Sequence, residues 1–584
     1  MSEVCVELVG KLVGEMLGLS KEELSPSDNL ISLGLGSLDI MRIAGLLTKN
    51  GCNVTFSELV SNPCMASWVN FARERSARSS SNGSPLLGSA NYSKGDPFPI
   101  TSVQHAYMVG RRDGQELGGT ACHAYMEFEC GSLDAAKLER AVELLILRHP
   151  MLRARFSDDG TARIEDKVTW KGLTTYRVEG AGNPDSRIEG IRQELSHLRF
   201  DIEQDDLIDV RLTVVSPKRT IMHINVDLLA ADVLSIQVLL EDLAHLYDGT
   251  DLAPIEIDFM EYARRTGIGE DARNEDREYW LNRIDNMPGG PSLPLKAPME
   301  SVKRSQFTRM EYLIDSKSWK NFTEKGRQIG VTQSMGIAAV YAKALSRWSE
   351  DKKFLLNLPL FNRKPIHPDV DKIVSDFTSL ILLEADCANA ISLLELASQM
   401  QGRFQQDVAH SSFGAVEVLR ELSHRCPNDP KKAPVVFASN IGTQFISNKV
   451  EDVFGPLSKM LAETPQVLLD HQIYDHKNGL LLAWDYVSEL LDDKIAKQMF
   501  EAYCTAVRFY CENDWSEPFP DLLPPSQRAA RAEANSEGAD LGGGTLHGRF
   551  FARAQAEPDA PALRWGADGE ATYGELAGRA LRIA

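Results

Sequence analysis

Residues 225–235 read Asn-Val-Asp-Leu-Leu-Ala-Ala-Asp-Val-Leu-Ser, and this stretch decides how the rest of the chain is interpreted. The residues that lead into it, Thr220 to Asp227, alternate between apolar and polar side chains, as a half-buried strand does. Asp232 to Tyr247 then have the periodicity of a helix. We therefore expect a strand-to-helix turn on which Asp227 and Asp232 can face the same space.

This pair of aspartates has an ordinary structural explanation. Asp232 would cap the helix, and Asp227 would bind an arginine. An Asp-x4-Asp-x2-Ser pattern is common, so by itself it does not indicate a catalytic site.

The chain around this turn divides into segments of different character. Residues 97–523 alternate between helix and strand patterns, with a Gly- and Pro-rich connector that separates lobes of about 97–285 and 299–523. Residues 1–78 have the pattern of a small helical domain, and residues 79–96 that of a Ser-, Gly- and Asn-rich flexible linker. A second linker is expected at 524–545, before a helix-then-strand pattern at 546–584 that stops abruptly.

Composition limits the partners. The chain has 584 residues and a net charge of −20, which repels phosphate backbones and anionic lipid, so we expect neither nucleic acid nor a membrane as a partner. Its nine cysteines are scattered without a Cys-x-x-Cys pair, which indicates free thiols in a reducing compartment and no metal site. Without a signal peptide or an apolar run long enough to span a bilayer, the predicted location is the cytoplasm.

Ser37 follows a Gly-rich turn and opens a predicted helix. Serine is a favoured N-cap residue, so capping alone would explain it. However, Asp28-Asn29-Leu30 followed by residues 33–38, Leu-Gly-Leu-Gly-Ser-Leu, resembles the phosphopantetheine attachment site of acyl and peptidyl carrier domains. The resemblance implies that a phosphopantetheinyl transferase attaches 4′-phosphopantetheine covalently to Ser37.

The strand-to-helix turn carries a second resemblance. Condensation domains of nonribosomal peptide synthetases have a His-His-x3-Asp-Gly motif at such a turn, and their heterocyclization relatives have Asp-x4-Asp-x2-Ser, as at Asp227, Asp232 and Ser235. Leu228 stands where the catalytic histidine of an ordinary condensation domain would be. Other heterocyclization motifs follow in order, at residues 98–111, 148–153, 293–295, 375–378, 434–439 and 464–470. For Asp227 and Asp232 we expect a structural role, against an arginine such as Arg111 or Arg153.

This resemblance implies a proton shuttle for ring closure. In the family, the aspartate that ends the Thr-Pro-Gln-Val-x-x-Asp motif works with a threonine, so Asp470 is the first candidate. Ala438 occupies the threonine position here. Either Ser439 supplies the hydroxyl, or Asp470 acts with a water molecule or with Gln466.

The order of domains resembles the starting module of aryl-capped siderophore synthetases, such as those for pyochelin and yersiniabactin. It implies a four-helix carrier followed by a two-lobed α/β fold like that of chloramphenicol acetyltransferase. A stand-alone salicylate AMP ligase would load the carrier, the salicyl thioester would be condensed with carrier-bound cysteine, and cyclodehydration would give an aryl-thiazoline. Residues 546–584 resemble the start of an adenylation domain, so downstream adenylation and carrier domains are expected partners. Two alternatives stay open: a domain that only condenses and releases a linear amide, and a non-catalytic scaffold that docks carriers.

Overall fold

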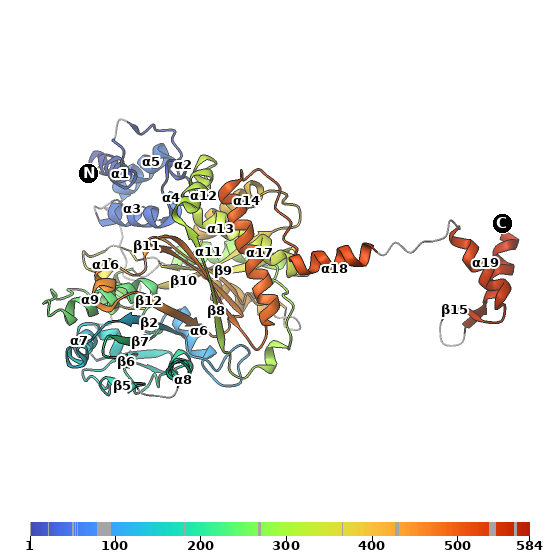
Figure 1. Ribbon diagram of the computed structural model, residues 1–584. Coiled ribbons are helices and arrows are strands. Elements are labelled where there is room, and N and C mark those ends of the chain that lie inside the picture. Colours follow the sequence, from blue (N-terminus) through green and yellow to red (C-terminus); the bar gives the residue numbers. More distant parts are fainter. Residues whose placement is uncertain are drawn as a thin grey trace. The chain divides into compact units, whose positions relative to one another are not determined.

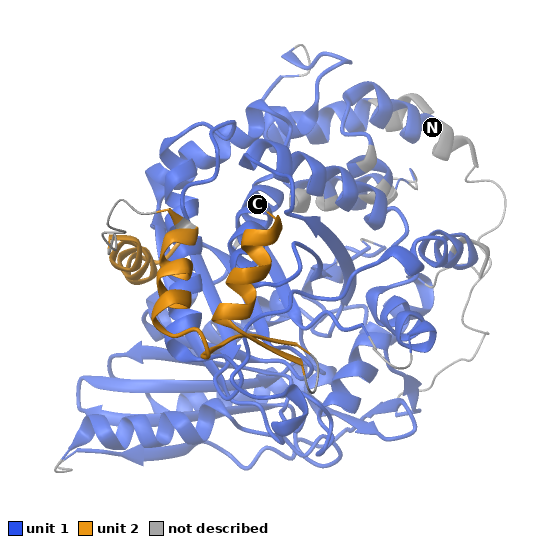
Figure 2. Cartoon of the chain, turned by 90° about the vertical axis from the view of Figure 1, so that its right-hand side faces the viewer, with its two compact units in different colours: residues 1–522 blue, residues 523–584 orange. Residues whose placement is uncertain are grey.

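The protein is described by a computed structural model over residues 2–20, 23–49, 52, 54, 56–78, 95–179, 183–266, 270–361, 363–364, 366–426, 431–536, 545–565 and 569–583. The chain forms two compact units, residues 1–522 and 523–584 (Figure 2). The expected linker at 79–96 lies almost wholly outside the described residues. Over the described ranges, no helix is both long enough and apolar enough to cross a bilayer.

The N-terminal segment is helical, in blue in Figure 1. Its described part contains three longer helices and two short ones, where four were expected: α1 (Ser2–Leu17), α2 (Leu30–Leu33), α3 (Ser37–Lys49), α4 (Phe56–Ser61) and α5 (Met65–Arg78). Apolar residues at helical spacing form its core, among them Val9, Val13, Ile40, Ile43 and Leu47. Buried Trp68 ties α5 to α4, because its indole Nε1 donates to the Leu59 carbonyl at 2.9 Å.

This helical segment contacts the second lobe. Arg327, on α12 (Ser316–Gln328), donates a hydrogen bond to the Leu33 carbonyl at the end of α2. The next residue, Gly34, has φ 121°, and a Cβ there would lie 2.8 Å from the Arg327 guanidinium carbon. Only glycine therefore suits both the backbone and the close approach at this position.

The first lobe is built on a five-stranded sheet of order β12-β2-β7-β6-β5. Its strands are β2 (His123–Cys130), β5 (Thr174–Arg177), β6 (Ile208–Ser216), β7 (Arg219–Asp227) and β12 (Leu457–Glu463). The same part of the chain also forms a three-stranded sheet of order β1-β4-β3. Its strands are β1 (Phe98–Pro99), β3 (Ala154–Ser157) and β4 (Thr161–Ile164). The helices here are α6 (Ser102–Gly110), α7 (Ala135–Arg148), α8 (Pro184–Ser196), α9 (Val233–Tyr247) and α10 (Phe259–Thr266). The next helix, α11 (Glu270–Leu281), packs on the second lobe, where Trp280 Nε1 donates to the His410 carbonyl at 2.9 Å.

One strand from the C-terminal half of the chain joins the sheet of the first lobe. This corrects the expected division into one lobe before residue 285 and another after residue 299. β12 comes from the C-terminal half of the chain but pairs antiparallel with β2, from Leu457 opposite Phe128 to Glu463 opposite His123. Helix α16 (Asn448–Phe454) precedes it and packs on α9. The composition of residues 448–463 gives no sign that they cross to the other lobe, because strand pairing depends on tertiary context.

The second lobe has a six-stranded mixed sheet of order β10-β9-β11-β13-β14-β8 (Figure 1). Its strands are β8 (Phe307–Asp315), β9 (Lys353–Phe361), β10 (Thr378–Asp386), β11 (Val435–Gln444), β13 (Leu469–His476) and β14 (Gly479–Val487). The helices are α12, α13 (Gln333–Trp348), α14 (Leu393–Val408), α15 (Ala415–Arg425) and α17 (Asp493–Glu512). α13 is buried along most of its length, because its own small and apolar side chains lie on nearly all sides of the helix.

The second unit contains α18 (Pro525–Ser536), α19 (Leu546–Ala556), β15 (Pro561–Trp565), β16 (Gly569–Thr572) and α20 (Tyr573–Ile583). α18 occupies much of the stretch expected to be a linker, because its Ala- and Arg-rich sequence has high helix propensity. The helix-then-strand pattern expected after it is present as α19 followed by the β15–β16 hairpin.

The cysteines differ from expectation at one position. Cys52 is disulfide-bonded. The free cysteines of the described ranges are Cys64, Cys122, Cys130, Cys387, Cys426, Cys504 and Cys511.

Candidate active site

A cavity of about 510 Å³ lies between the two lobes and takes its walls from both. The first lobe contributes residues of α6 and of the turn before α9, and the second contributes the cavity-facing residues of β9, β11 and β13. Its polar lining includes Tyr107, Asn357, Asp376, Asn440, Gln466, Asp470, Gln472 and Tyr474. The cavity is large enough for a small substrate rather than a single water molecule.

Asp470 lies in this cavity on β13 and is only 6 % exposed. Gln472 Nε2 donates to its Oδ2 at 2.7 Å, while Oδ1 has no hydrogen-bond partner among the described residues. The pKa of Asp470 is raised to about 7, mainly by burial and in smaller part by the nearby charge of Asp485. The Gln472 hydrogen bond and the charge of Arg309 oppose that rise in pKa. The carboxyl group can therefore donate or accept a proton near neutral pH.

Gln472 is held in one orientation. Its Oε1 accepts hydrogen bonds from Tyr474 Oη and from Arg309 Nη2, each at 2.6 Å. Arg309 is itself paired with Asp485, with Nη2 2.7 Å from Oδ2. Because Oε1 already accepts two donors, the amide nitrogen must point to Asp470.

Gln472 and Tyr474 are site residues that the motif analysis did not identify. The available signal was the alternation of a strand, which places Asp470, Gln472 and Tyr474 on one face of β13. His471, between them, points into the core, where its Nε2 lies 2.7 Å from Tyr503 Oη.

The structure does not bring Ser439 to Asp470, which corrects one of the alternatives from the sequence. Along β11, Val436, Ala438 and Asn440 line the cavity, and Ser439 points to the other side of the sheet. There its Oγ lies 2.8 Å from Ser334 Oγ. The two-residue period of the strand requires this, because neighbouring side chains face opposite sides.

Gln466 does line the cavity. It has φ 63°, and its backbone N–H donates to the Leu117 carbonyl at 2.7 Å. A non-glycine residue in this region of backbone space is uncommon and often marks a functional turn.

Asp227 has the arginine partner that its buried carboxylate requires. Arg111 Nη1 lies 2.7 Å from Asp227 Oδ2, and the Leu229 N–H donates to the other oxygen at 3.1 Å. Arg111 also donates to the Phe200 carbonyl at 3.1 Å. With both oxygens engaged, Asp227 stabilises the strand-to-helix turn.

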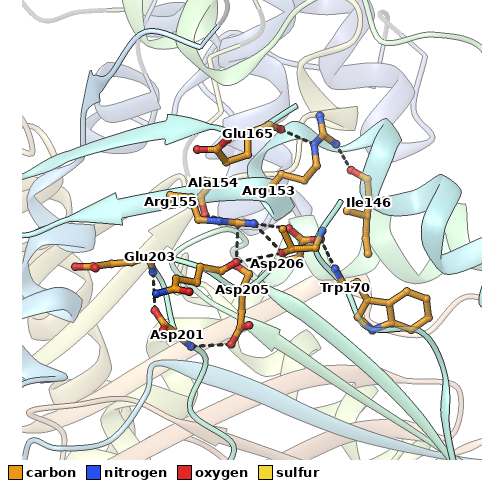
Figure 3. Close-up of polar contacts among 12 residues, drawn as sticks. Ile146, Arg153, Ala154, Arg155, Glu165, Trp170, Asp201, Glu203, Asp205 and Asp206 are labelled. Carbon is orange, nitrogen blue, oxygen red and sulfur yellow. Dashed lines mark hydrogen bonds and ion pairs between the residues drawn. The ribbon is translucent and has the colours of Figure 1, made fainter. Parts of the chain in front are cut away.

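Asp232 caps α9, and its arginine is one that the sequence analysis did not name. The Ser235 N–H donates to Asp232 Oδ1 at 2.7 Å, and Arg363 Nη2 donates to the same oxygen at 2.8 Å. Arg363 also donates to Ser235 Oγ at 2.8 Å. Arg153, the other arginine suggested, lies elsewhere and donates to the carbonyls of Ile146 and Glu165 (Figure 3).

Ser37 is the first residue of α3; its side chain lies outside what the structure describes. The first helical bond joins the Ile40 N–H to the Gly36 carbonyl at 3.1 Å, and the Gly36 N–H is taken by Asp39 Oδ2 at 2.9 Å. Amide groups of a first helical turn have no partner within the helix, so a phosphodiester is accommodated at this end of α3. The site fits a phosphopantetheine arm.

The geometry agrees with comparisons to known proteins. Residues 98–513 match the condensation domain family, and residues 7–72 match the phosphopantetheine attachment site family. The chain therefore belongs to the condensation domain family of nonribosomal peptide synthetases, whose members are condensation and heterocyclization enzymes, and it also carries a phosphopantetheine attachment domain.

Two curated relatives are similar over almost the whole chain. One is "Phenyloxazoline synthase MbtB" of Mycolicibacterium paratuberculosis, 35 % identical over 98 % of this chain and 49 % of the relative. The other is "Pyochelin synthetase PchE" of Pseudomonas aeruginosa, 35 % identical over 99 % of this chain and 40 % of the relative. The chain thus spans half or less of the length of these relatives.

A solved structure supports the same class. The EpoB cyclization-docking bidomain from Sorangium cellulosum matches with a TM-score of 0.66 and 30 % identity, over 72 % of this chain and 87 % of that one. A structure of the nonribosomal peptide synthetase FmoA3 matches with a TM-score of 0.68 and 30 % identity, over 86 % of this chain and 51 % of that one.

Proposed function

We propose that the chain is the initiating part of a siderophore-type synthetase that joins a carrier-bound aryl group to carrier-bound cysteine and closes the product to an aryl-thiazoline. The observation that supports this most directly is the Asp470 carboxyl group, which is buried in the cavity between the lobes and has one oxygen without a partner in the described part of the chain. The names of the relatives MbtB and PchE refer to phenyloxazoline and to pyochelin, which makes an aryl heterocycle the best-supported product class.

Ring closure requires a group that both accepts and donates a proton. The side-chain thiol of the new cysteinyl amide attacks the amide carbonyl carbon, a C–S bond forms, and the thiol proton passes to the carbonyl oxygen. The amide nitrogen then gives up its proton, a C=N bond forms, and the C–O bond breaks so that the oxygen leaves as water with both protons. Asp470 is suited to move these protons because its pKa of about 7 lets either protonation state form at neutral pH. Gln472 holds the carboxyl group in place, and Gln466 lies in the same cavity to contact the substrate.

Ser37 would hold the phosphopantetheine arm, whose thiol carries the aryl group as a thioester. The proposal then requires a phosphopantetheinyl transferase, a stand-alone salicylate AMP ligase, and downstream adenylation and carrier domains, of which residues 546–584 would be the first part. All of these components would be cytoplasmic. Asp227, Asp232 and Ser235 would brace the cavity wall and take no part in proton transfer.

The test uses the whole chain. The protein is primed with phosphopantetheine, loaded with salicylate by a salicylate AMP ligase, and offered the cysteinyl or the seryl thioester of N-acetylcysteamine. We expect product that has lost one water relative to the linear amide, and Asp470→Asn should shift the product toward the linear amide. Serine and cysteine acceptors compete in the same assay to decide between oxazoline and thiazoline. A wild-type chain that joins neither acceptor to the salicyl group would overturn the proposal.

Ala438 favours a second candidate, a domain that condenses without closing the ring, because this position carries no hydroxyl beside Asp470. It predicts linear amide alone from the wild-type chain. A non-catalytic scaffold predicts instead that Asp470→Ala leaves product formation unchanged.

A further inference from the structure

The cavity contains a second buried acid, which none of the roles above uses. Asp376 lies in the loop before β10, is 1 % exposed and lines the cavity wall. Its Oδ1 accepts the Thr378 N–H at 3.0 Å, and its Oδ2 has no hydrogen-bond partner among the described residues. A buried carboxyl oxygen without a partner is costly unless it serves a bound group.

The first lobe holds the loop of Asp376 in place. The Asp232 N–H donates to the Ser375 carbonyl at 3.1 Å, and Ser235 Oγ donates to the same carbonyl at 2.7 Å. The Phe377 N–H donates to Asp232 Oδ2 at 3.3 Å. The Asp-x4-Asp-x2-Ser motif thus fixes the backbone on both sides of Asp376, which positions the carboxyl group as a reacting group requires.

The surroundings of Asp376 suit proton transfer. Its pKa is raised to about 7, mainly by burial and in smaller part by the charge of Asp232, against the opposing effect of hydrogen bonding from Thr378. Asp376 also interacts electrostatically with Tyr107 and Cys122, whose own pKa values burial raises well above the usual range, so both stay neutral. Arg363, which is bound to Asp232, brings a positive charge to this loop, because its guanidinium lies over the Phe377 ring, 4.2 Å from the centroid.

Amide formation needs a proton acceptor, and ring closure needs a separate proton transfer. The strand-to-helix turn presents Leu228 and Asp232 to the cavity. Both oxygens of Asp232 already accept hydrogen bonds, from Ser235 and Arg363 on one and from Phe377 on the other. Asp376 belongs to the loop that packs on this same turn. Asp470, on β13, also keeps one oxygen without a partner among the described residues, but it is the acid that we assign to ring closure.

We propose that Asp376 is the catalytic proton acceptor for the amide-forming step, acting on the α-amine of the incoming aminoacyl group. This assignment rests on the proposed function. The amine nitrogen attacks the thioester carbonyl carbon, a C–N bond forms, and the C–S bond breaks. The unpaired oxygen of Asp376 takes the proton that the amine loses, and this proton then passes to the departing thiolate. The carboxylate is regenerated, and the step needs no other reactant.

The experiment distinguishes Asp376 from Asp470 by what each controls: Asp376 the rate of total product, and Asp470 the fraction of product that is cyclised. The whole chain, primed and loaded with salicylate, is mixed with the cysteinyl thioester of N-acetylcysteamine. The rate of total product, linear plus cyclised, is measured by mass spectrometry in a single turnover. We expect Asp376→Asn to slow total product by about 100-fold, as loss of a general base does, without changing the ratio of cyclised to linear product. Asp376→Glu, which keeps a carboxyl group, should recover part of the rate.

Asp371→Asn is the matched control, because Asp371 is an exposed aspartate of the segment that precedes the same loop. It should behave as the wild type. Circular dichroism and the melting temperature establish that each variant is folded.

Two results would overturn the assignment. A folded Asp376→Asn variant that forms total product within about twofold of the wild-type rate would exclude a base role. A variant that changes only the cyclised fraction would place Asp376 in ring closure instead. Failure of the wild-type chain to join donor and acceptor is a different outcome, because it removes the proposed function itself.

Discussion

Ala438 lies opposite Gln472 in the parallel pairing of β11 with β13. Two pairs earlier in the same register, and on the same face of the sheet, Val436 lies opposite Asp470. A hydroxyl at position 438 would therefore stand on the cavity face next to the acid that we assign to ring closure.

This register predicts that Ala438→Thr increases ring closure. The new hydroxyl can donate to Asp470 or to the departing oxygen, and one such hydrogen bond is worth about 1.4 kcal/mol, or about tenfold in rate. The ratio of cyclised to linear product measures the effect. Ala438→Val is the control because valine has the same shape without the hydroxyl. An equal rise with valine would show that volume, rather than hydrogen bonding, limits the reaction.

The buried pair of Arg111 and Asp227 predicts a structural rather than a catalytic defect. Removing either partner leaves an uncompensated buried charge, so we expect Asp227→Ala and Arg111→Ala each to destabilise the protein by about 3–5 kcal/mol. Urea unfolding and a double-mutant cycle measure this, with strong coupling between the two sites.

The neighbouring pair of Arg112 and Asp158 provides the control. Its atoms are 3.0 Å apart, but the side chains are 54 % and 80 % exposed. Arg112→Ala should cost less than about 1 kcal/mol. If Asp227→Ala kept its full stability and lost activity, Asp227 would belong to the chemistry after all.

How much of this site was visible in the sequence depends on the residue. Asp470 and Gln466 were expected from motifs, and both line the cavity. Ser439 was expected as one alternative, but a strand turns neighbouring side chains to opposite faces, and no motif states which face is inside. The partner of Asp232 was missed because Arg363 follows it by 131 positions, and only the packing of the two lobes brings them together.

For the fold as well, the sequence predicts some elements and not others. The helix expected from Asp232 to Tyr247 is present as α9, Val233–Tyr247, with Asp232 as its N-cap, because its apolar periodicity is strong. The crossing of β12 into the first sheet was not visible, since a short strand pattern does not identify its partner.

Asp470→Asn should stabilise the protein in a pH-dependent way. The folded-state pKa of Asp470, about 7, is above its ordinary value of 3.8, so the folded protein retains a proton that the unfolded chain releases. The stability that this proton contributes is complete below the unfolded pKa and is lost as the pH rises through about 7. Asparagine does not titrate, so the variant should gain up to a few kcal/mol over the wild type between about pH 5 and pH 8. Melting temperatures across this range measure the gain, and Asp371→Asn should show none. A gain that does not depend on pH would mean that the Asp470 carboxyl group does not titrate in this range.

Gln472→Leu should move the pH dependence of ring closure to higher pH. The amide of Gln472 donates to Asp470 Oδ2 at 2.7 Å, and this hydrogen bond favours the charged carboxylate and lowers the pKa of Asp470. Leucine has a similar volume but no donor, so the pKa of Asp470 must rise. If the slow step needs the charged carboxylate, the rising limb of the pH profile of ring closure moves to higher pH. If it needs the neutral acid, the falling limb moves to higher pH. Tyr474→Phe removes only the hydrogen bond to Gln472 Oε1, leaves the amide nitrogen facing Asp470, and should shift the profile less. The fraction of cyclised product, followed from about pH 5 to pH 9, measures both shifts. An unchanged profile for Gln472→Leu would mean that a group other than Asp470 titrates in the ring-closing step.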